Sequence, residues 1–290
     1  MTRVALFLLL LFLVLPTLAV AVQTIPSIKV KAPPMLDGSI KDPAWDSAPL
    51  TSVKDAVAGV DVLLRSVYTD DSVYFQVLFP DPAENSYHKP WIWDDTSKAY
   101  AEGAHREDTF VIKWNLENHD VNLSNFSDDN YRADEWYWKA NRSNLAGYAD
   151  DKLQILSGEN VADSTETIST TGKKRYLQRL SDRGEPPYRE VAKPTEFSGP
   201  LVNRYESNVP TGSHADVLAK GVWNGGLWFI EFGRKLKTDD HLDIQFLPKT
   251  GKKYLFGVSV FSLYGNPLDQ SQPNRYGMGH ISEPLYLEFR

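Results

Sequence analysis

Apolar and polar residues alternate with a period of two along much of the chain, which is the pattern of strands that bury one face. In the run 73–79 the apolar side chains Val73, Phe75, Val77 and Phe79 fall on one face. The polar turn 69–72 separates this run from the apolar-rich run 61–68. The two runs therefore predict a β-hairpin.

The second predicted hairpin has the more specific turn. Its strands are 216–223 and 227–234, and Asn224-Gly225-Gly226 lies between them. Glycine adopts the positive φ angles that tight hairpin turns require. Further strands are predicted over 109–114, 243–247, 254–261 and 284–289.

The pattern predicts an all-β fold, a β-sandwich or barrel with long loops and few short helices. No window longer than two turns has an apolar stripe of helical period. Between 150 and 215 the alternation disappears, and the composition turns to Gly, Pro, Ser, Thr and charge. We therefore expect a loop-rich insertion there, either a cover over a site or a solvated loop.

The first 21 residues have the features of a secretory signal peptide. Arg3 precedes the apolar run 4–15, Pro16 ends the run, and Ala19-Val20-Ala21 offers a cleavage site. We expect cleavage after Ala21, which leaves residues 22–290 as one exported, periplasmic domain. The alternative is an uncleaved membrane anchor over 4–22, which is close to the length of a membrane span.

Composition removes several classes of function. The chain has 290 residues, a net charge of −7 and no cysteine. Phosphate backbones are bound by clustered Lys and Arg, so a nucleic-acid partner is not expected. Without cysteine there are no disulfides, zinc–cysteine sites, iron–sulfur clusters or covalently attached c-type haem. Any haem must be held noncovalently.

The common catalytic motifs are absent from the sequence. It has no Gly-x-Ser-x-Gly elbow, no His-Glu-x-x-His motif and no phosphate-binding glycine loop. Adjacent aspartates recur, and such pairs mostly cap turns. One of them, Asp150-Asp151, could bind Ca²⁺ if further ligands lay close.

Eight tryptophans are many for this length. Trp91 and Trp93 are two residues apart, as are Trp136 and Trp138, so in a strand each pair projects to one face. Such a pair forms an aromatic platform for a sugar or a planar macrocycle, or it fills the sandwich core. Both interpretations stay open.

Histidine and methionine are the neutral metal ligands available. His88, His105 and His214 occur in polar surroundings typical of solvated side chains. His119 follows the predicted strand 109–114. His280 belongs to Gly277-Met278-Gly279-His280, where the glycines allow the backbone to approach a bulky cofactor or simply form a flexible turn.

Several short segments carry a family resemblance. Leu36-Asp37-Gly38 followed by Asp42-Pro43-Ala44-Trp45 resembles the start of the DOMON-like and carbohydrate-binding-module-nine-like sandwiches. The later segments are 107–114, Ala133-Asp134-Glu135-Trp136-Tyr137-Trp138-Lys139-Ala140, 147–151, 215–217, 221–223, 232–239 and 254–261. Taken in order, they resemble the ethylbenzene dehydrogenase-related haem-binding domain.

This resemblance implies a β-sandwich that holds one noncovalent haem b and transfers single electrons, as or with a subunit of a molybdenum oxidoreductase of the dimethylsulfoxide reductase type. Family members use a mid-domain methionine and a late lysine as axial ligands, and this chain lacks both. The expected iron ligands are therefore His119 and His280, with Met278 as rival to His280. The expected haem contacts are Trp136, Trp138, Lys139, Gly277 and Gly279.

Two alternatives from other classes remain. The chain could be a carbohydrate-binding sandwich module that uses a tryptophan platform, or a cofactor-free sensor or subunit of the same fold. In none of these interpretations is the chain expected to be an enzyme by itself.

Overall fold

The computed structural model describes residues 22–39, 41–55, 59–249, 251–261 and 284–290. The predicted signal peptide therefore lies outside the described residues, and so do Gly277, Met278, Gly279 and His280.

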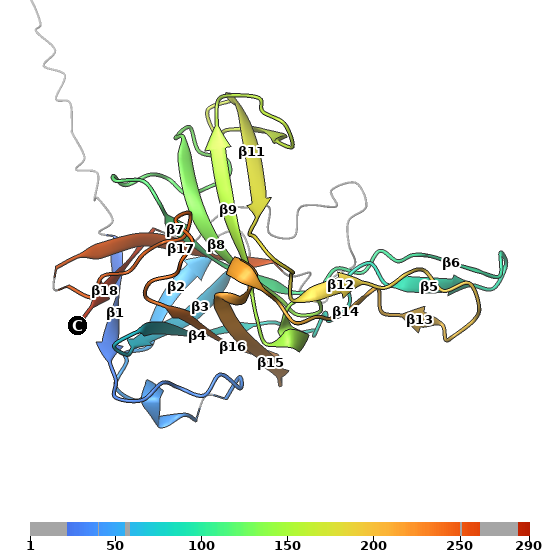
Figure 1. Cartoon of the computed structure of the whole chain (residues 1–290), viewed down its shortest axis with the longest axis horizontal. Helices are drawn as coiled ribbons and strands as arrows, with labels where there is room; N and C mark the ends of the chain where they lie inside the picture. The colour runs from blue at the N-terminus through green and yellow to red at the C-terminus, as the bar shows by residue number, and fades with distance from the viewer. Residues whose placement is uncertain (1–21, 40, 56–58, 250, 262–283) are drawn as a thin grey trace, which may run out of the picture.

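The described residues form one continuous 13-stranded sheet, which folds over into two facing halves (Figure 1). One half contains β7 (Thr109–Asn115), β8 (Tyr131–Lys139), β9 (Asp150–Ser157), β10 (Thr165–Ile168), β11 (Lys174–Ser181), β17 (Lys253–Phe261) and β18 (Leu285–Phe289). The other contains β1 (Gln23–Lys29), β2 (Thr51–Asp55), β3 (Val60–Tyr68), β4 (Ser72–Pro80), β15 (Val217–Asn224) and β16 (Leu227–Lys235). The all-β sandwich prediction is confirmed.

Strand β1 joins the two halves. It pairs in parallel with β18, where Gln23 lies opposite Leu285, and in parallel with β3, where Ser27 lies opposite Ser66. Every other pairing between these strands is antiparallel. The sheet is therefore continuous only because of this one strand.

The core lies between the two halves and is strongly aromatic. Phe75 of β4 packs 5.6 Å from Trp114 of β7 and 6.0 Å from Phe256 of β17, measured between ring centroids. Phe79 stacks on Phe110 at 5.8 Å. Burial of such side chains is the main stabilising term of a sandwich.

The segments Leu36-Asp37-Gly38 and Asp42-Pro43-Ala44-Trp45 have a structural role. Asp42 caps the 3₁₀ helix η1 (Pro43–Trp45) by accepting a hydrogen bond from the Ala44 amide. The indole of Trp45 donates to Glu231 Oε1 at 2.8 Å, and the Gly38 amide donates to Glu231 Oε2 at 2.8 Å. The motif thus fastens the segment between β1 and β2 to β16.

Five short strands form an arm that extends away from the sandwich (Figure 1). They are β5 (Trp91–Asp94), β6 (Ala99–Glu102), β12 (Tyr188–Glu190), β13 (Leu201–Val202) and β14 (Tyr205–Ser207). In the arm β13 pairs with β5, β5 pairs with β6, and β12 pairs with β14. Two segments that are distant in sequence therefore build it together.

Both predicted hairpins are confirmed as β3–β4 and β15–β16. The predicted strands 109–114, 254–261 and 284–289 correspond to β7, β17 and β18. Helical structure in the described residues is limited to the 3₁₀ turns η1, η2 (Asn144–Ala146) and η3 (Gly212–Ala215). Among these residues, no helix has the length and apolarity to cross a membrane.

The prediction of a strand over 243–247 is wrong. The Ile244 amide donates to Asp134 Oδ2 at 2.9 Å, and the Ile244 carbonyl accepts from Arg234 at 2.8 Å. Ile244 and Phe246 are buried in the core. The apolar alternation is real, but side chains and one backbone bond, from the Phe246 amide to the Leu236 carbonyl at 2.7 Å, take the place of a strand ladder.

The expectation of a loop-rich segment over 150–215 also needs correction. The segment contains all or part of six strands, β9 to β14. Strand β9 buries Asp151 and Gln154, so its inward positions do not alternate apolar with polar. Because of these polar residues, the alternation pattern does not predict β9.

Candidate functional site

Trp136 and Trp138 lie on β8 with both rings in the core and 0 % exposed. The Trp136 ring is 5.2 Å from Trp114, and the Trp138 ring is 4.9 Å from Trp228. The core-packing interpretation therefore describes this pair. A contact between these rings and a cofactor stays a prediction.

Trp91 and Trp93 lie on β5 in the arm and remain partly exposed. The Arg204 guanidinium lies 4.8 Å from the Trp91 ring centroid. The Trp93 ring packs 5.0 Å from Tyr100 and 5.2 Å from Phe197, itself 60 % exposed. Of the two predicted platforms, this pair retains aromatic surface on the outside of the molecule.

Lys139, predicted as a cofactor contact, ends β8 in a buried polar network. Its ammonium forms an ion pair with Asp150 and donates to Tyr188 Oη at 3.1 Å. Burial lowers the pKa of Lys139, although the charge of Asp150 opposes the shift. Burial also acts to raise the pKa of Asp150, but Lys139 and Lys152 outweigh it and hold that pKa low. The Lys139 amine is thus already paired.

Two histidines expected to be solvated are not. His214 is 4 % exposed. The His88 side chain is mostly buried, with Nδ1 3.4 Å from Glu107 Oε1. Burial and the positive charge of Arg142 lower the pKa of His88 to about 2. His88 is therefore neutral at physiological pH. Arg142 also pairs with Glu107 at 2.5 Å.

His119, a predicted iron ligand, lies exposed on the loop after β7. The loop is held by a hydrogen bond from Asn115 Nδ2 to the His119 carbonyl at 2.7 Å. His119 Nδ1 hydrogen-bonds with Asn118 Oδ1 at 3.0 Å, so Nε2 is the nitrogen that could bind a metal. His119 and His241 both line a mainly polar cavity of about 470 Å³.

A more apolar cavity of about 380 Å³ begins at the next residue, Asp120. Its walls include Val121, Leu255, Phe256 and Pro284. Pro284 comes four residues after His280 in the sequence. Asp120 and Leu255 also line the polar cavity that contains His119, so the two cavities are neighbours. Apolar walls beside a histidine are compatible with a bound macrocycle.

A buried charge cluster is the feature that sequence reasoning missed. Asp134 of β8, Asp151 of β9 and Asp243 each place a carboxylate oxygen within 4.8 Å of the others. The Arg234 guanidinium of β16 lies 2.6 Å from Asp243, 3.5 Å from Asp134 and 3.8 Å from Asp151. All four side chains are at most 3 % exposed. The only sequence signal was the suggestion of Ca²⁺ at Asp150-Asp151.

Electrostatics in this cluster are dominated by burial. Burial raises the pKa of Asp151 well above its ordinary value, and the charge of Asp134 adds to the shift. Burial also raises the pKa of Asp134. Burial and the neighbouring Asp243 raise the pKa of Asp182 to about 8. Burial and the neighbouring acids thus favour the protonated, neutral form of these carboxyl groups unless a further cation binds.

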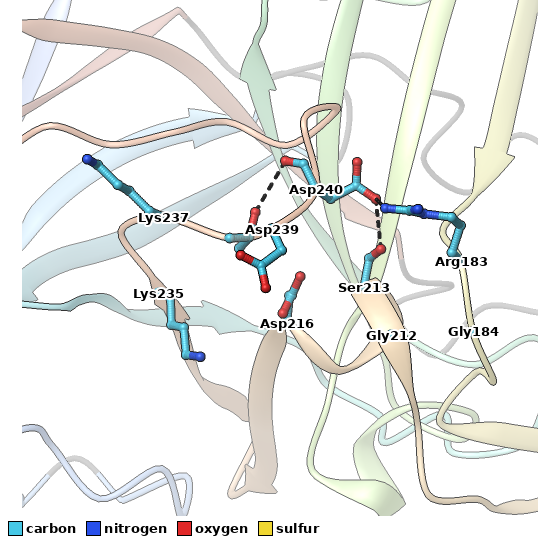
Figure 2. A pocket seen from close by; sticks show the side chains of 10 residues that line it. Arg183, Gly184, Gly212, Ser213, Asp216, Lys235, Lys237, Asp239 and Asp240 are labelled. Carbon is cyan, nitrogen blue, oxygen red and sulfur yellow. Dashed lines mark hydrogen bonds and ion pairs between the residues drawn. The ribbon is translucent and has the colours of Figure 1, made fainter.

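A cavity of about 410 Å³ (Figure 2) adjoins this cluster through Thr238, which lines the cavity and donates a hydrogen bond to Asp243. On its wall Asp240 accepts hydrogen bonds from Ser213 at 2.8 Å and Arg183 at 3.2 Å, as Figure 2 shows. Asp240 contributes to the raised pKa of Asp182, and the pKa of wall residue Asp216 is raised by burial and by Asp243. The cavity thus lies on one side of the cluster.

A fourth cavity, of about 430 Å³, lies at the end of the sandwich from which the arm extends. Tyr87 and Trp223 line it, together with Asn141, Asn203 and Lys220. Asn141 is 4 % exposed and its Oδ1 has no hydrogen-bond partner. Aromatic rings beside amide and ammonium groups suit a polar ligand with apolar faces.

Comparison with known proteins gives one family and one structural likeness. No curated protein matches the sequence. Two solved structures of a family 9 carbohydrate binding module from Caldicellulosiruptor kristjanssonii, in complex with glucose and with cellotriose, are similar at 12 % identity and TM-scores of 0.39. The matches cover 91 % and 92 % of this chain and 96 % and 95 % of those chains. The family model described as ethylbenzene dehydrogenase matches residues 24–275, and the chain therefore belongs to the ethylbenzene dehydrogenase family.

Proposed function

We propose that the chain is a periplasmic haem b protein that transfers single electrons, as a subunit or partner of a molybdenum oxidoreductase. The observation that carries the proposal is the family match over residues 24–275. The proposal includes export by the signal peptide predicted over residues 1–21. The absence of cysteine requires that the haem be held without thioether bonds.

The apolar cavity bordered by Val121, Leu255 and Pro284 supports this function. His119 precedes Asp120, which lines both this cavity and the neighbouring polar one, and His280 lies four residues before Pro284 in the sequence. An extended chain spans about 3.3–3.6 Å per residue, so four residues can reach across such a cavity. In this proposal His119 and His280 bind the iron, and the bound haem supplies one-electron redox chemistry. The apolar side chains on the cavity walls would bury part of the macrocycle's apolar surface and so favour its retention.

The first prediction concerns the haem itself. The mature protein, expressed with adequate haem, is expected to show a Soret band and to release its haem into acidified organic solvent. His119→Ala is expected to lose most of the haem or to change a low-spin spectrum to high-spin, because one axial ligand is removed. Visible spectra and haem content per chain are the measurements.

His241→Ala is the matched control, since His241 lines the same polar cavity as His119 but is not a predicted ligand. It is expected to keep the wild-type spectrum. His280→Ala and Met278→Ala distinguish the two candidates for the second ligand. A haem-replete preparation without a Soret band contradicts the proposed function, and full haem occupancy in His119→Ala contradicts the assignment of that ligand.

The cavity lined by Tyr87 and Trp223 favours carbohydrate binding as a second candidate function. Sugars present apolar faces to aromatic rings and hydroxyl groups to amides such as Asn141. Neutral oligosaccharides are expected to quench tryptophan fluorescence of the wild type, and Trp223→Ala is expected to abolish the change. Trp93→Ala, in the arm, tests the exposed platform instead, and loss of quenching in that variant alone would move the sugar site to the arm. Equal quenching in Trp223→Ala, or none in the wild type, removes this candidate.

A further inference from the structure

The buried cluster of Asp134, Asp151 and Asp243 contains more negative than positive charge. Three carboxylates meet a single guanidinium, that of Arg234. Asp182, on the chain after β11, faces the same carboxylates. Arg183, which follows Asp182, is engaged with Asp240 at 3.2 Å. Uncompensated charge of this kind is costly in a protein interior, so protons or a bound cation must balance it.

The oxygen atoms of the cluster divide into engaged and open ones. Asp134 Oδ2 accepts from the Ile244 amide at 2.9 Å, and Asp243 Oδ2 accepts from Thr238 Oγ1 at 2.5 Å. Asp134 Oδ1 is buried without a hydrogen-bond partner. The protein thus fixes one oxygen of Asp134 and one oxygen of Asp243. The second oxygen of Asp134 is left for another group.

Asp151 gives a separate indication of a missing ligand. Its side chain is 1 % exposed, and its Oδ2 has no donor within hydrogen-bond distance, with Arg234 Nε 3.8 Å away. The facing Asp134 carboxyl group can reach it only through a shared proton. Buried polar atoms in folded proteins nearly always have a partner. Because Asp151 points toward Asp134 and Asp243, the group that would satisfy Oδ2 lies among the three acids.

The donor set selects the class of ion. Only carboxylate oxygens are present, with no imidazole or thiolate, and such sites suit Ca²⁺ or Mg²⁺ rather than zinc or copper. Oxygens that share one Ca²⁺ at about 2.3–2.6 Å lie within about 5 Å of each other, as these three do. Mg²⁺ requires near-octahedral geometry, whereas Ca²⁺ accepts irregular sets completed by water.

We propose that Asp134, Asp151 and Asp243 bind one Ca²⁺ ion, which links β8, β9 and the segment after β16 inside the sandwich. Asp243 itself lines the polar cavity of about 470 Å³, which gives the ion a route from solvent. None of the three acids is a proposed haem ligand or haem contact, although Asp243 lines the same polar cavity as His119. Its role is structural, because the ion joins segments that the chain brings together only on folding.

The experiment uses the mature chain, residues 22–290, dialysed against EDTA and then titrated with CaCl₂ in a calorimeter. One Ca²⁺ per chain is expected to bind, and at 100 times Kd the Tm is expected to rise by about 5–10 °C. Asp151→Asn is expected to weaken binding at least tenfold. Asp239→Asn, which changes an exposed acid on the neighbouring cavity wall, is expected to bind like the wild type.

Two outcomes overturn the proposal. The first is a wild-type protein whose Tm is unchanged by 1 mM CaCl₂ at pH 8, which means that protons alone balance the cluster. The second is Asp151→Asn protein that binds Ca²⁺ as tightly as the wild type, which puts the ion elsewhere. The wild-type titration does not depend on whether any variant folds, and haem content is not a readout, so failure here is distinguishable from failure of the haem proposal.

Discussion

Replacing Arg234 with methionine is expected to lower the free energy of unfolding by about 3–5 kcal/mol. Methionine keeps most of the side-chain volume, so the loss comes from charge. Arg234 is fully buried, contacts three carboxylates and donates to the Ile244 carbonyl at 2.8 Å. Without it, these carboxylates have no counter-charge in the protein. Denaturant unfolding in the presence of EDTA measures the effect of the guanidinium alone.

Arg189→Met is the matched control, because Arg189 forms an exposed ion pair with Glu206 at 2.5 Å. Exposed pairs contribute about 0–1 kcal/mol, so this variant is expected to unfold close to the wild type. If the two arginine variants lost the same stability, the cluster would not depend on Arg234 for its charge balance.

Trp138→Ala is expected to cost about 3–5 kcal/mol as well, through a different cause. The ring is 0 % exposed, packs against Trp228 and donates from Nε1 to Asn144 Oδ1 at 3.0 Å. A Cβ added at Gly221 would lie 2.3 Å from the Trp138 ring, so the backbone of β15 packs closely against this ring. Removing the indole therefore leaves a large cavity. Thermal and denaturant unfolding measure the loss.

Trp93→Ala is expected to cost far less than Trp138→Ala, since Trp93 lies in the arm and is partly exposed. The comparison separates the two tryptophan pairs that look identical in sequence. A small effect of Trp138→Ala would mean that its ring is not part of the core and would restore the platform interpretation for β8.

The sequence predicts correctly those strands whose alternating apolar residues are bounded by residues suited to a tight turn. The β15–β16 hairpin is an example, because Gly225 and Gly226 have φ of +59° and +88° between two alternating strands. Strand β9 was missed because Asp151 and Gln154 occupy buried positions where the pattern requires apolar residues. The run 243–247 was overpredicted for the opposite reason, since its apolar residues are buried without a strand partner.

The candidate sites were less predictable than the fold. Asp134, Asp151, Arg234 and Asp243 come from different parts of the chain, and no spacing rule links them. Only the register of β8 with β9, in which Trp136 lies opposite Asp151, brings the first two together. His119 could be named from sequence, but the apolar cavity beside it depends on how β17 and β18 pack.

The position of β1 has a consequence for how the protein folds. Gln23 pairs with Leu285, and the same strand pairs with β3, so the two halves of the sheet are connected through contacts between residues very far apart in sequence. Loop-closure entropy must be overcome before such contacts form, which slows folding. Each half can gain its antiparallel hairpins early, but the complete sheet forms only when β18 is available. Until then β3 and β18 expose unpaired backbone edges, which makes this late intermediate the species most prone to aggregate.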